Sequence, residues 1–124
     1  MEPSDRLAGA MLFAIGAAIA APAFGQEAGK HAVTSTYKVL LDNARVIAGE
    51  ASWAPGTQDA NVARSARVIR GLVGGTLSVI YADGRTEKRT FEPGGVYYFE
   101  QDTVANYLRN DGTSEVKVYF VILK

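Results

Sequence analysis

Residues 94–112 read GGVYYFEQDTVANYLRNDG, and this stretch decides the expected fold. It opens with a glycine turn, continues as a short aromatic run, passes an acidic corner at Glu100 to Thr103, and returns as a second apolar run that ends at NDG. Aromatic and β-branched residues favour strands, whereas Asn, Asp and Gly favour the turns between them. The stretch therefore predicts a pair of short strands around the acidic corner.

The same alternation of strands and turns extends in both directions. Asp83-Gly84 lies between LSVIY (77–81) and TEKRTF (86–91) and is a strong hairpin signal. EPGG (92–95) suits a tight turn, and the C-terminal run places four apolar residues on one face, namely Val116, Val118, Phe120 and Ile122. Upstream, YKVLL (37–41) alternates with Tyr37, Val39 and Leu41 on one face, and ARVIAGEASW (44–53) is a further strand candidate. Short, regularly spaced strands predict an all-β sandwich or small barrel.

One stretch of the domain is ambiguous. In QDANVARSAR (58–67) and just beyond it, Arg64, Arg67 and Arg70 recur at every third residue. A helix would gather such residues on one side, but the stretch is too short to decide between a helix and extended chain.

The first 25 residues differ from the rest. A short polar start is followed by an uncharged run rich in Ala and Gly, with Ala23 and Gly25 before Gln26. This order predicts a signal helix that is cleaved before Gln26, so that the mature protein is periplasmic or secreted and has no stable membrane insertion. A retained membrane anchor is the alternative, because the apolar run approaches the length of a membrane span. Residues 26–36 are expected to form a flexible lead-in, and 37–124 a single domain.

Composition excludes several classes of function. The chain has 13 basic and 13 acidic residues and no cysteine. Near-neutral charge gives no reason to expect nucleic acid as a partner, and the lack of cysteine removes thiol chemistry and disulfides. The serines of the domain have no histidine base, since the only histidine, His31, lies in the lead-in. We therefore assign no catalytic residue and no hydrolytic triad.

The order of turns resembles that of a small single-domain cupin of the RmlC-like barrel type. The resemblance covers about residues 37–124 and rests on the succession of PG (55–56), GGTL (74–77), the DG hairpin (83–84), PGGV (93–96) and the spacing of Asn106 and Asn110. It implies a cupin-like antiparallel β-barrel or jelly roll. It also implies homodimers, since cupins often pair through edge strands, and in many members a divalent metal inside the barrel.

The metal ligands of that family are missing here. The positions that would carry a His-x-His pair fall on Asn61 and Ala63 or, with a one-residue gap, on Val62 and Arg64. The position of the further histidine falls on Asn106 by its spacing to Asn110, or on Ala105 by counting from Gly94. Amides are weak metal ligands and guanidinium groups offer no lone pair, so we predict that the metal site is lost and that no cofactor is bound.

Asn106 is a candidate for the interior of the barrel. If it points inward, strand alternation places Val104 and Leu108 on the inner face with it. The structural interpretation is an internal hydrogen bond, with Asn61 as the opposite residue, and the functional interpretation is a polar anchor for a ligand. We favour the structural one because buried polar groups are usually satisfied within the protein.

Other side chains are weaker candidates. Arg64, Arg67 and Arg70 would suit an anion-binding mouth, but a charged, exposed edge strand is the favoured interpretation. Glu100 and Asp102 would suit acid–base chemistry or a hard cation, but a solvated corner is favoured. Aromatic residues are expected mostly in the core and in part around a ligand cavity. The pocket candidates from all these arguments are Asn61, Asn106, Trp53, Tyr98, Arg64 and Arg67.

Three classes of function follow. The preferred one is an exported, metal-free cupin-like protein that binds a small, partly apolar molecule or serves as an accessory module. The second is a cupin enzyme of isomerase or dioxygenase type with atypical ligands. The third is a structural dimerisation module of the cell envelope.

Overall fold

The computed structural model describes residues 32–124, and the expected signal helix, the cleavage site and His31 lie outside this part of the chain. Its eight strands are β1 (Thr36–Asp42), β2 (Val46–Trp53), β3 (Arg67–Val73), β4 (Gly75–Tyr81), β5 (Thr86–Phe91), β6 (Val96–Phe99), β7 (Asn106–Arg109) and β8 (Val116–Leu123). Within residues 32–124 the secondary structure is all strand, as expected, and no helix there has the length and apolar character needed to cross a bilayer.

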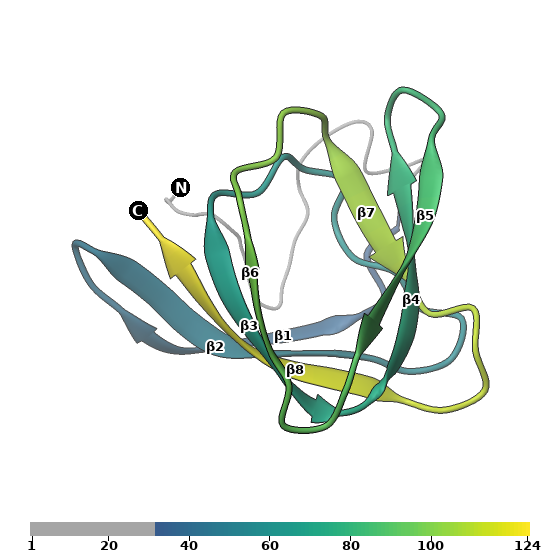
Figure 1. Cartoon of the computed structure of the whole chain (residues 1–124), viewed down its shortest axis with the longest axis horizontal. Helices are drawn as coiled ribbons and strands as arrows, with labels where there is room; N and C mark the ends of the chain where they lie inside the picture. The colour runs from purple at the N-terminus through teal and green to yellow at the C-terminus, as the bar shows by residue number, and fades with distance from the viewer. Residues whose placement is uncertain (1–31) are drawn as a thin grey trace.

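The strands form two antiparallel sheets that face each other across the interior (Figure 1). The larger sheet has the order β1-β2-β8-β3-β6, and the smaller one has the order β5-β4-β7. The ambiguous stretch 58–67 is not a helix. It runs beside β7 and makes two isolated bridges, Gln58 with Arg109 and Val62 with Asn106. This connection therefore extends the smaller sheet along one side of the interior.

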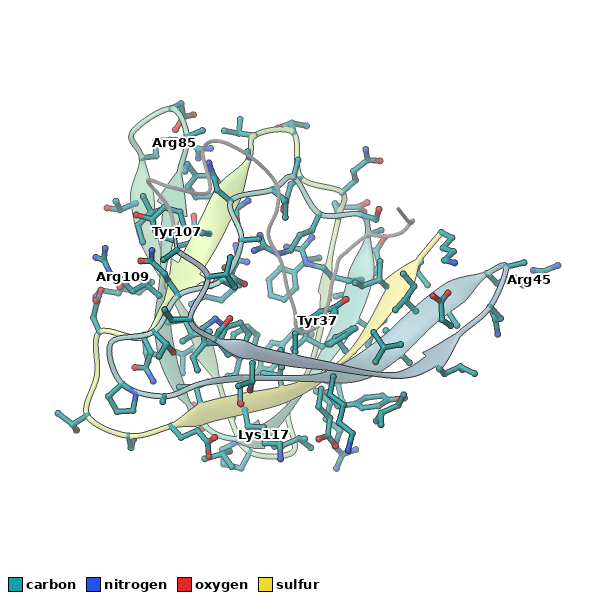
Figure 2. All side chains as sticks on the ribbon, turned by 180° about the vertical axis from the view of Figure 1, so that it is seen from behind. Tyr37, Arg45, Arg85, Tyr107, Arg109 and Lys117 are labelled. Carbon is teal, nitrogen blue, oxygen red and sulfur yellow. The ribbon has the colours of Figure 1, made fainter. Side chains whose placement is uncertain are left out.

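The predicted turns are present where glycine permits them. Gly84 in the β4–β5 hairpin has φ of 98° and Gly94 before β6 has φ of 79°, a region that side chains other than that of glycine rarely adopt. Arg85 lies at the tip of the β4–β5 hairpin, and Arg45 at the far tip of the β1–β2 hairpin (Figure 2).

The strand pair predicted around the acidic corner is wrong. β6 pairs with β3 in the larger sheet, whereas β7 pairs with β4 in the smaller one. The corner at residues 100–105 carries the chain from one sheet to the other. Each strand still turns one face to the interior, so the alternation was interpreted correctly but the pairing partner was not.

The face assigned to Leu41 is also wrong. Tyr37 pairs with Ala51 and Val39 with Gly49, but the register shifts between Val39 and Leu41, so that Leu41 lies opposite Ala48. A bulge of this kind turns the following side chain to the other face of the sheet. Leu41 therefore belongs to the outer face.

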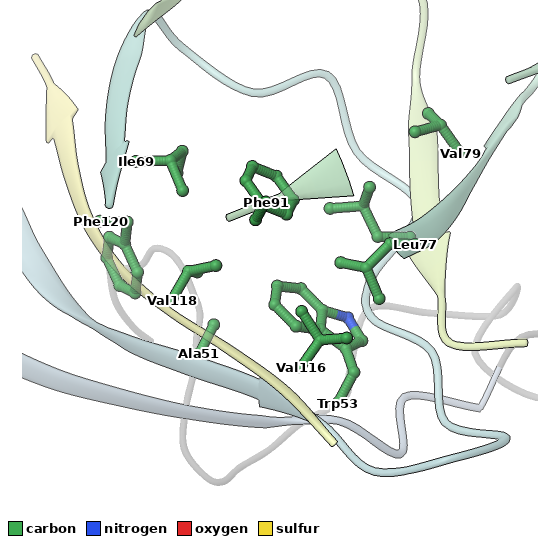
Figure 3. Close-up of a cluster of buried hydrophobic side chains, with 10 residues drawn as sticks. Ala51, Trp53, Ile69, Leu77, Val79, Phe91, Val116, Val118 and Phe120 are labelled. Atoms are coloured by element: carbon green, nitrogen blue, oxygen red, sulfur yellow. The ribbon is translucent and has the colours of Figure 1, made fainter. Parts of the chain in front are cut away.

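The core lies between the two sheets. Inward side chains of β2, β3 and β8 meet those of β4 and β5 (Figure 3). Leu77 and Val79 of β4 are completely buried. On the predicted face of β8, Val116, Val118 and Phe120 are buried and Ile122 is partly buried against the core. The fully packed part of the interior is this cluster, and the space beside it is the candidate site.

Candidate functional site

A cavity of about 90 Å³ opens between the sheets next to the core. Its lining residues come from both sheets and from the connection between β2 and β3. Nine are apolar and four are charged, with one tyrosine: Ala51, Trp53, Ile69, Phe91, Phe99, Leu108, Val118, Phe120, Ile122, Asp59, Arg64, Arg67, Arg89 and Tyr37.

Arg67 opens β3 on its inward face, and its side chain is only 5% exposed. The guanidinium donates from Nη1 to the Ser65 and Glu100 carbonyl oxygens, at 3.1 and 3.3 Å, and from Nη2 to Asp102 Oδ1 at 3.3 Å. Burial and the nearby charge of Arg64 lower the pKa of Arg67, whereas Asp102 raises it. The paired carboxylate is what makes a buried guanidinium tolerable at this position.

Arg64 enters the interior from the connection before β3. Its Nη1 donates to Asn106 Oδ1 at 2.7 Å and to the Asn106 carbonyl at 3.1 Å, and its Nη2 donates to Asp59 Oδ2 and to the Ala60 carbonyl, both at 3.0 Å. Asp59 Oδ1 in turn accepts the Leu108 backbone N–H at 2.7 Å. These bonds join the connection to β7 and leave the Arg64 side chain in one orientation.

Asp102 links Arg64, Arg67 and Asn106. Its Oδ2 accepts the Arg64 backbone N–H at 3.0 Å and the Asn106 Nδ2 at 3.1 Å. Burial raises the pKa of Asp102, but the hydrogen bonds from Arg64 and Asn106 and the charges of Arg67 and Arg64 outweigh it, so that the pKa lies below its ordinary value. The carboxylate is therefore ionised at neutral pH and belongs to a buried network, not to a solvated corner as expected.

Arg89 reaches the cavity from the smaller sheet. Its guanidinium lies 4.5 Å from the centroid of the Phe99 ring, and that of Arg67 lies 5.2 Å from the same ring. Arg89 Nη2 donates to Glu87 Oε2 at 2.9 Å, and Glu87 is exposed at the rim. Phe99 thus brings two guanidinium groups from different sheets to one end of the cavity.

Tyr37 covers part of the cavity from β1. Its ring stacks on Phe120 with centroids 5.1 Å apart, and Figure 2 shows the side chain on the inner side of the strand. Burial of the hydroxyl raises the pKa of Tyr37 above its ordinary value. The phenol is therefore neutral at physiological pH.

The structure brings three of the six predicted pocket residues to the cavity. Trp53, Arg64 and Arg67 line it, whereas Asn61 and Tyr98 are exposed away from it. Arg64 contributes the interior side chain of the first-motif region, and Asn61 and Ala63 do not. The exposed-edge interpretation of the arginines is wrong for Arg67, because β3 lies between β8 and β6 and its first side chain is buried.

Asn106 is buried, as strand alternation predicted, but its amide serves the network and not the cavity. Its partners are Arg64, Asp102 and the Val104 carbonyl, in place of the expected Asn61. The neighbouring Asn110 is likewise structural, because its Nδ2 donates to the Trp53 and Ser114 carbonyls, both at 2.8 Å. The structural interpretation of Asn106 is thus confirmed with different partners.

Sequence reasoning missed Arg89 and Tyr37. A signal for Arg89 was available: Phe91 ends the same strand as an apolar residue, and a residue two positions earlier shares its face. The sequence also contains no signal for the buried donor on Trp53. Trp53 Nε1 is the one buried side-chain nitrogen or oxygen without a hydrogen-bond partner within residues 32–124, and it lies on the side of the indole that faces Leu77 (Figure 3).

The residues around the cavity do not fit a metal ion. Within the described part of the chain, no group of three or more His, Cys, Asp or Glu side chains is placed to hold one. Arg64 occupies the interior where a ligand would be expected, and the side-chain oxygen Oδ1 of Asn106 already accepts a hydrogen bond from it. Guanidinium groups repel cations and offer no lone pair.

Comparison of the structure with solved proteins shows its fold. A cupin domain from Bordetella pertussis superposes with a TM-score of 0.66 at 20% identity, over 74% of this chain and 95% of that one. An RmlC-like cupin protein with a double-stranded β-helix fold from Methanocaldococcus jannaschii gives 0.58 at 15% identity, over 74% and 82% of the two chains. The chain has the cupin fold. A cupin superfamily protein from Desulfitobacterium hafniense gives 0.54 at 15% identity, over 73% and 77%.

No family model and no curated protein matches the sequence. The structural relatives therefore establish the cupin fold and leave the function to the site itself.

Proposed function

We propose that this cupin-fold chain is an exported, metal-free protein that binds a small molecule in the barrel cavity and acts as a binding or accessory module. The observation that carries the proposal is the lining of the cavity: most of its residues are apolar, and the guanidinium groups of Arg67 and Arg89 both lie close to the Phe99 ring, at 5.2 and 4.5 Å from its centroid. Ligand sites in proteins commonly combine an apolar wall with a small number of placed polar groups.

We favour binding over catalysis because the carboxylates in and beside the lining are paired with arginines. The lining contains no histidine, cysteine or lysine among the described residues. Asp59 pairs with Arg64, and Asp102 pairs with Arg67, both at 3.3 Å or less. A carboxylate held ionised by a guanidinium group has a lowered proton affinity and is a weak general base.

A cavity-filling variant tests the proposal. Small acids and aromatic compounds should raise the melting temperature of the protein, and Ala51→Leu should abolish these shifts because Ala51 lines the cavity. Ala54→Leu is the matched control, since Ala54 is exposed in the following turn. Compounds that stabilise both variants equally would place the binding elsewhere and overturn the proposal.

Export is a separate part of the proposal and has its own test. The small-residue end of the leader supports cleavage before Gln26. A C-terminally tagged protein expressed in a Gram-negative host should appear in the periplasmic fraction with a mass that starts at Gln26. A full-length product in the membrane fraction would show the anchor alternative instead.

The outer face of the larger sheet supports the proposed homodimer. An apolar row crosses all five strands through directly paired residues: Leu41, Ala48, Val121, Val68 and Tyr98. Leu41 and Tyr98, at its two ends, are about half exposed, at 50% and 53%. Val68 and Val121 are partly exposed, and Ala48 is buried at 1%, so the exposed apolar surface lies mainly at the two ends of the row. Exposed apolar surface favours a contact with another protein surface.

Charge complementarity favours a second copy of the chain as the partner. In the neighbouring row, Glu50 and Arg70 are each paired with Tyr119 of the central strand and flank it on opposite sides. A two-fold axis along β8 in the contact plane would set Glu50 of each copy opposite Arg70 of the other, and Leu41 opposite Tyr98. The contact would thus pair Glu50 with Arg70 and join the apolar ends, while Lys117 of β8, whose Nζ lies 3.6 Å from Glu50 Oε1 of its own chain, would face Lys117 of the other copy.

A further inference from the structure

We propose that the ligand of the cavity is a small monocarboxylate, with its carboxylate between Arg67 and Arg89 beside Phe99 and its hydrocarbon part against the apolar part of the lining. This inference rests on the proposed function and names the chemical class of the ligand. It follows from the unused donors, the charge balance and the shape of the lining.

Most of the unused donors belong to two of the three arginines. A guanidinium group carries five N–H donors. Both terminal nitrogens of Arg64 are occupied by the Asn106, Asp59 and Ala60 oxygens. Among residues 32–124, Arg64 is left with only its Nε without an acceptor. Arg67 Nη2 has a single acceptor and its Nε has none, and Arg89 has no acceptor at either Nε or Nη1. Arg64 therefore shapes the site, while Arg67 and Arg89 have donors available for a ligand.

The charge balance favours a single negative charge. Three guanidinium groups line the cavity, and two carboxylates with little exposure compensate them, Asp59 with 18% and Asp102 with 14% of the side chain exposed. The third carboxylate, Glu87, is 43% exposed and screened by solvent, so one positive charge is left at the cavity. Guanidinium groups match carboxylates and phosphates through parallel hydrogen bonds, but a phosphate group carries more than one negative charge at neutral pH, so a monocarboxylate fits the single remaining charge better.

The lining also argues against neutral donors and cations as ligands. Both oxygens of Asp59 already accept hydrogen bonds, from Leu108 N–H and from Arg64. A hydroxyl or amino group in the cavity would find donors but few acceptors, and a cation would be repelled by Arg67 and Arg89. The ligand must accept hydrogen bonds at this end of the cavity.

The apolar part of the lining favours a ligand whose hydrocarbon part is small. Trp53, Val118 and Phe120 are among the apolar residues of the lining, and the cavity volume is about 90 Å³. Such a space holds several water molecules or a short hydrocarbon chain, but not a drug-sized ligand. Acids with a short aliphatic chain match both the charged and the apolar part of this lining.

The test compares acids with their neutral amides. Acetate, butanoate, hexanoate and benzoate are titrated against the folded protein beside acetamide, butanamide, hexanamide and benzamide, with calorimetry and the fluorescence of Trp53 as readouts. Trp53 is the one tryptophan of the chain and lines the cavity. The variants are Arg89→Gln, whose ion-pair partner is at the exposed rim, and Arg85→Gln, an exposed arginine of the same hairpin, as control.

We expect at least one acid to bind about tenfold or more tightly than its amide, since the difference is a charge-assisted hydrogen-bond pair. Arg89→Gln should weaken the acid by a similar factor and leave the amide unchanged, and Arg85→Gln should change neither. Equal affinity for acid and amide, or an acid that binds as well to Arg89→Gln, would overturn this inference and leave the binding function in place. If neither series binds, the proposed function fails together with it.

Discussion

At the residue scale, the site depends on buried charges that stabilise one another. Arg67 and Asp102 form an ion pair in which each side chain is at most 14% exposed. Removal of one partner from a buried pair leaves the other charge without compensation, which is far more costly than the loss of a surface pair. A buried, paired carboxylate should therefore contribute much more to the stability of the protein than an exposed one. The sequence alone does not distinguish the two kinds.

Replacement of Asp102 tests this difference in stability contribution. We expect Asp102→Asn to lower the free energy of unfolding by about 3–5 kcal/mol, because Arg67 then stays buried without a carboxylate. Asp111→Asn is the matched control, because the Arg109–Asp111 pair is about 40% exposed on both sides and should contribute at most about 1 kcal/mol. Urea unfolding of both variants gives the two values, and similar losses would contradict the assignment.

The lowered pKa of Asp102 predicts acid sensitivity. A carboxylate whose pKa is lower in the folded state contributes stability above its ordinary pKa of 3.8, and this contribution is lost as the pH falls through the lower, folded value. The free energy of unfolding should therefore decrease with falling pH below about 4. Asp102→Asn should show a weaker decrease over the same range, and an identical pH profile would argue against the ionised network.

The sequence predicted the burial of a side chain correctly where the alternation of residues along a strand determines it. Asn106 was correctly placed inside the barrel because side chains of a strand alternate. Arg67 was not, because its burial depends on Asp102, which lies 35 positions away, and on a corner whose path the local sequence does not determine. Long-range compensation of charge is therefore the part of the site that composition and spacing missed.

At the scale of elements, the strands were predicted better than their pairing. The β4–β5 hairpin follows from Asp83-Gly84, and the buried face of β8 follows from its spacing. The β6–β7 pairing failed because a corner of six residues permits either a hairpin or a crossing between sheets. Whether the corner forms a hairpin or crosses between the sheets depends on the neighbouring strands, β3 in the larger sheet and β4 in the smaller one.

The buried face of β8 allows a matched stability test. Val118 is 2% exposed and lies in the core, whereas Val73 at the end of β3 is 43% exposed. We expect Val118→Ala to lower the free energy of unfolding by about 1.5–3 kcal/mol, which is the value of a fully buried valine side chain. Val73→Ala should change it by about 0.5 kcal/mol or less. Equal effects of the two variants would contradict the assigned face.

At the scale of the whole molecule, the outer face of the larger sheet predicts self-association. We expect the purified domain to be a dimer in solution, and Arg70→Glu to convert it to a monomer because Glu50 of the other copy would then face a like charge. Arg70→Glu combined with Glu50→Arg should restore the dimer. Light scattering coupled to size-exclusion chromatography reports each state.

The control for this test is Arg85→Glu, because Arg85 is exposed on the smaller sheet and far from the proposed contact (Figure 2). Dimers that persist in Arg70→Glu, or a charge swap that does not restore them, would contradict the two-fold arrangement. The sequence resemblance implied a dimer through edge strands, whereas the contact that we propose is through the face of the larger sheet.

We propose that an arginine–carboxylate network occupies the part of the interior where the resemblance to cupins implied a metal site. Elemental analysis of the full chain, purified without chelator and by a method free of metal-affinity resin, tests it most directly. We expect far less than one Mn, Fe, Ni or Zn ion per chain, because the cavity wall offers guanidinium groups where metal ligands would be needed. One tightly held transition-metal ion per chain would contradict it.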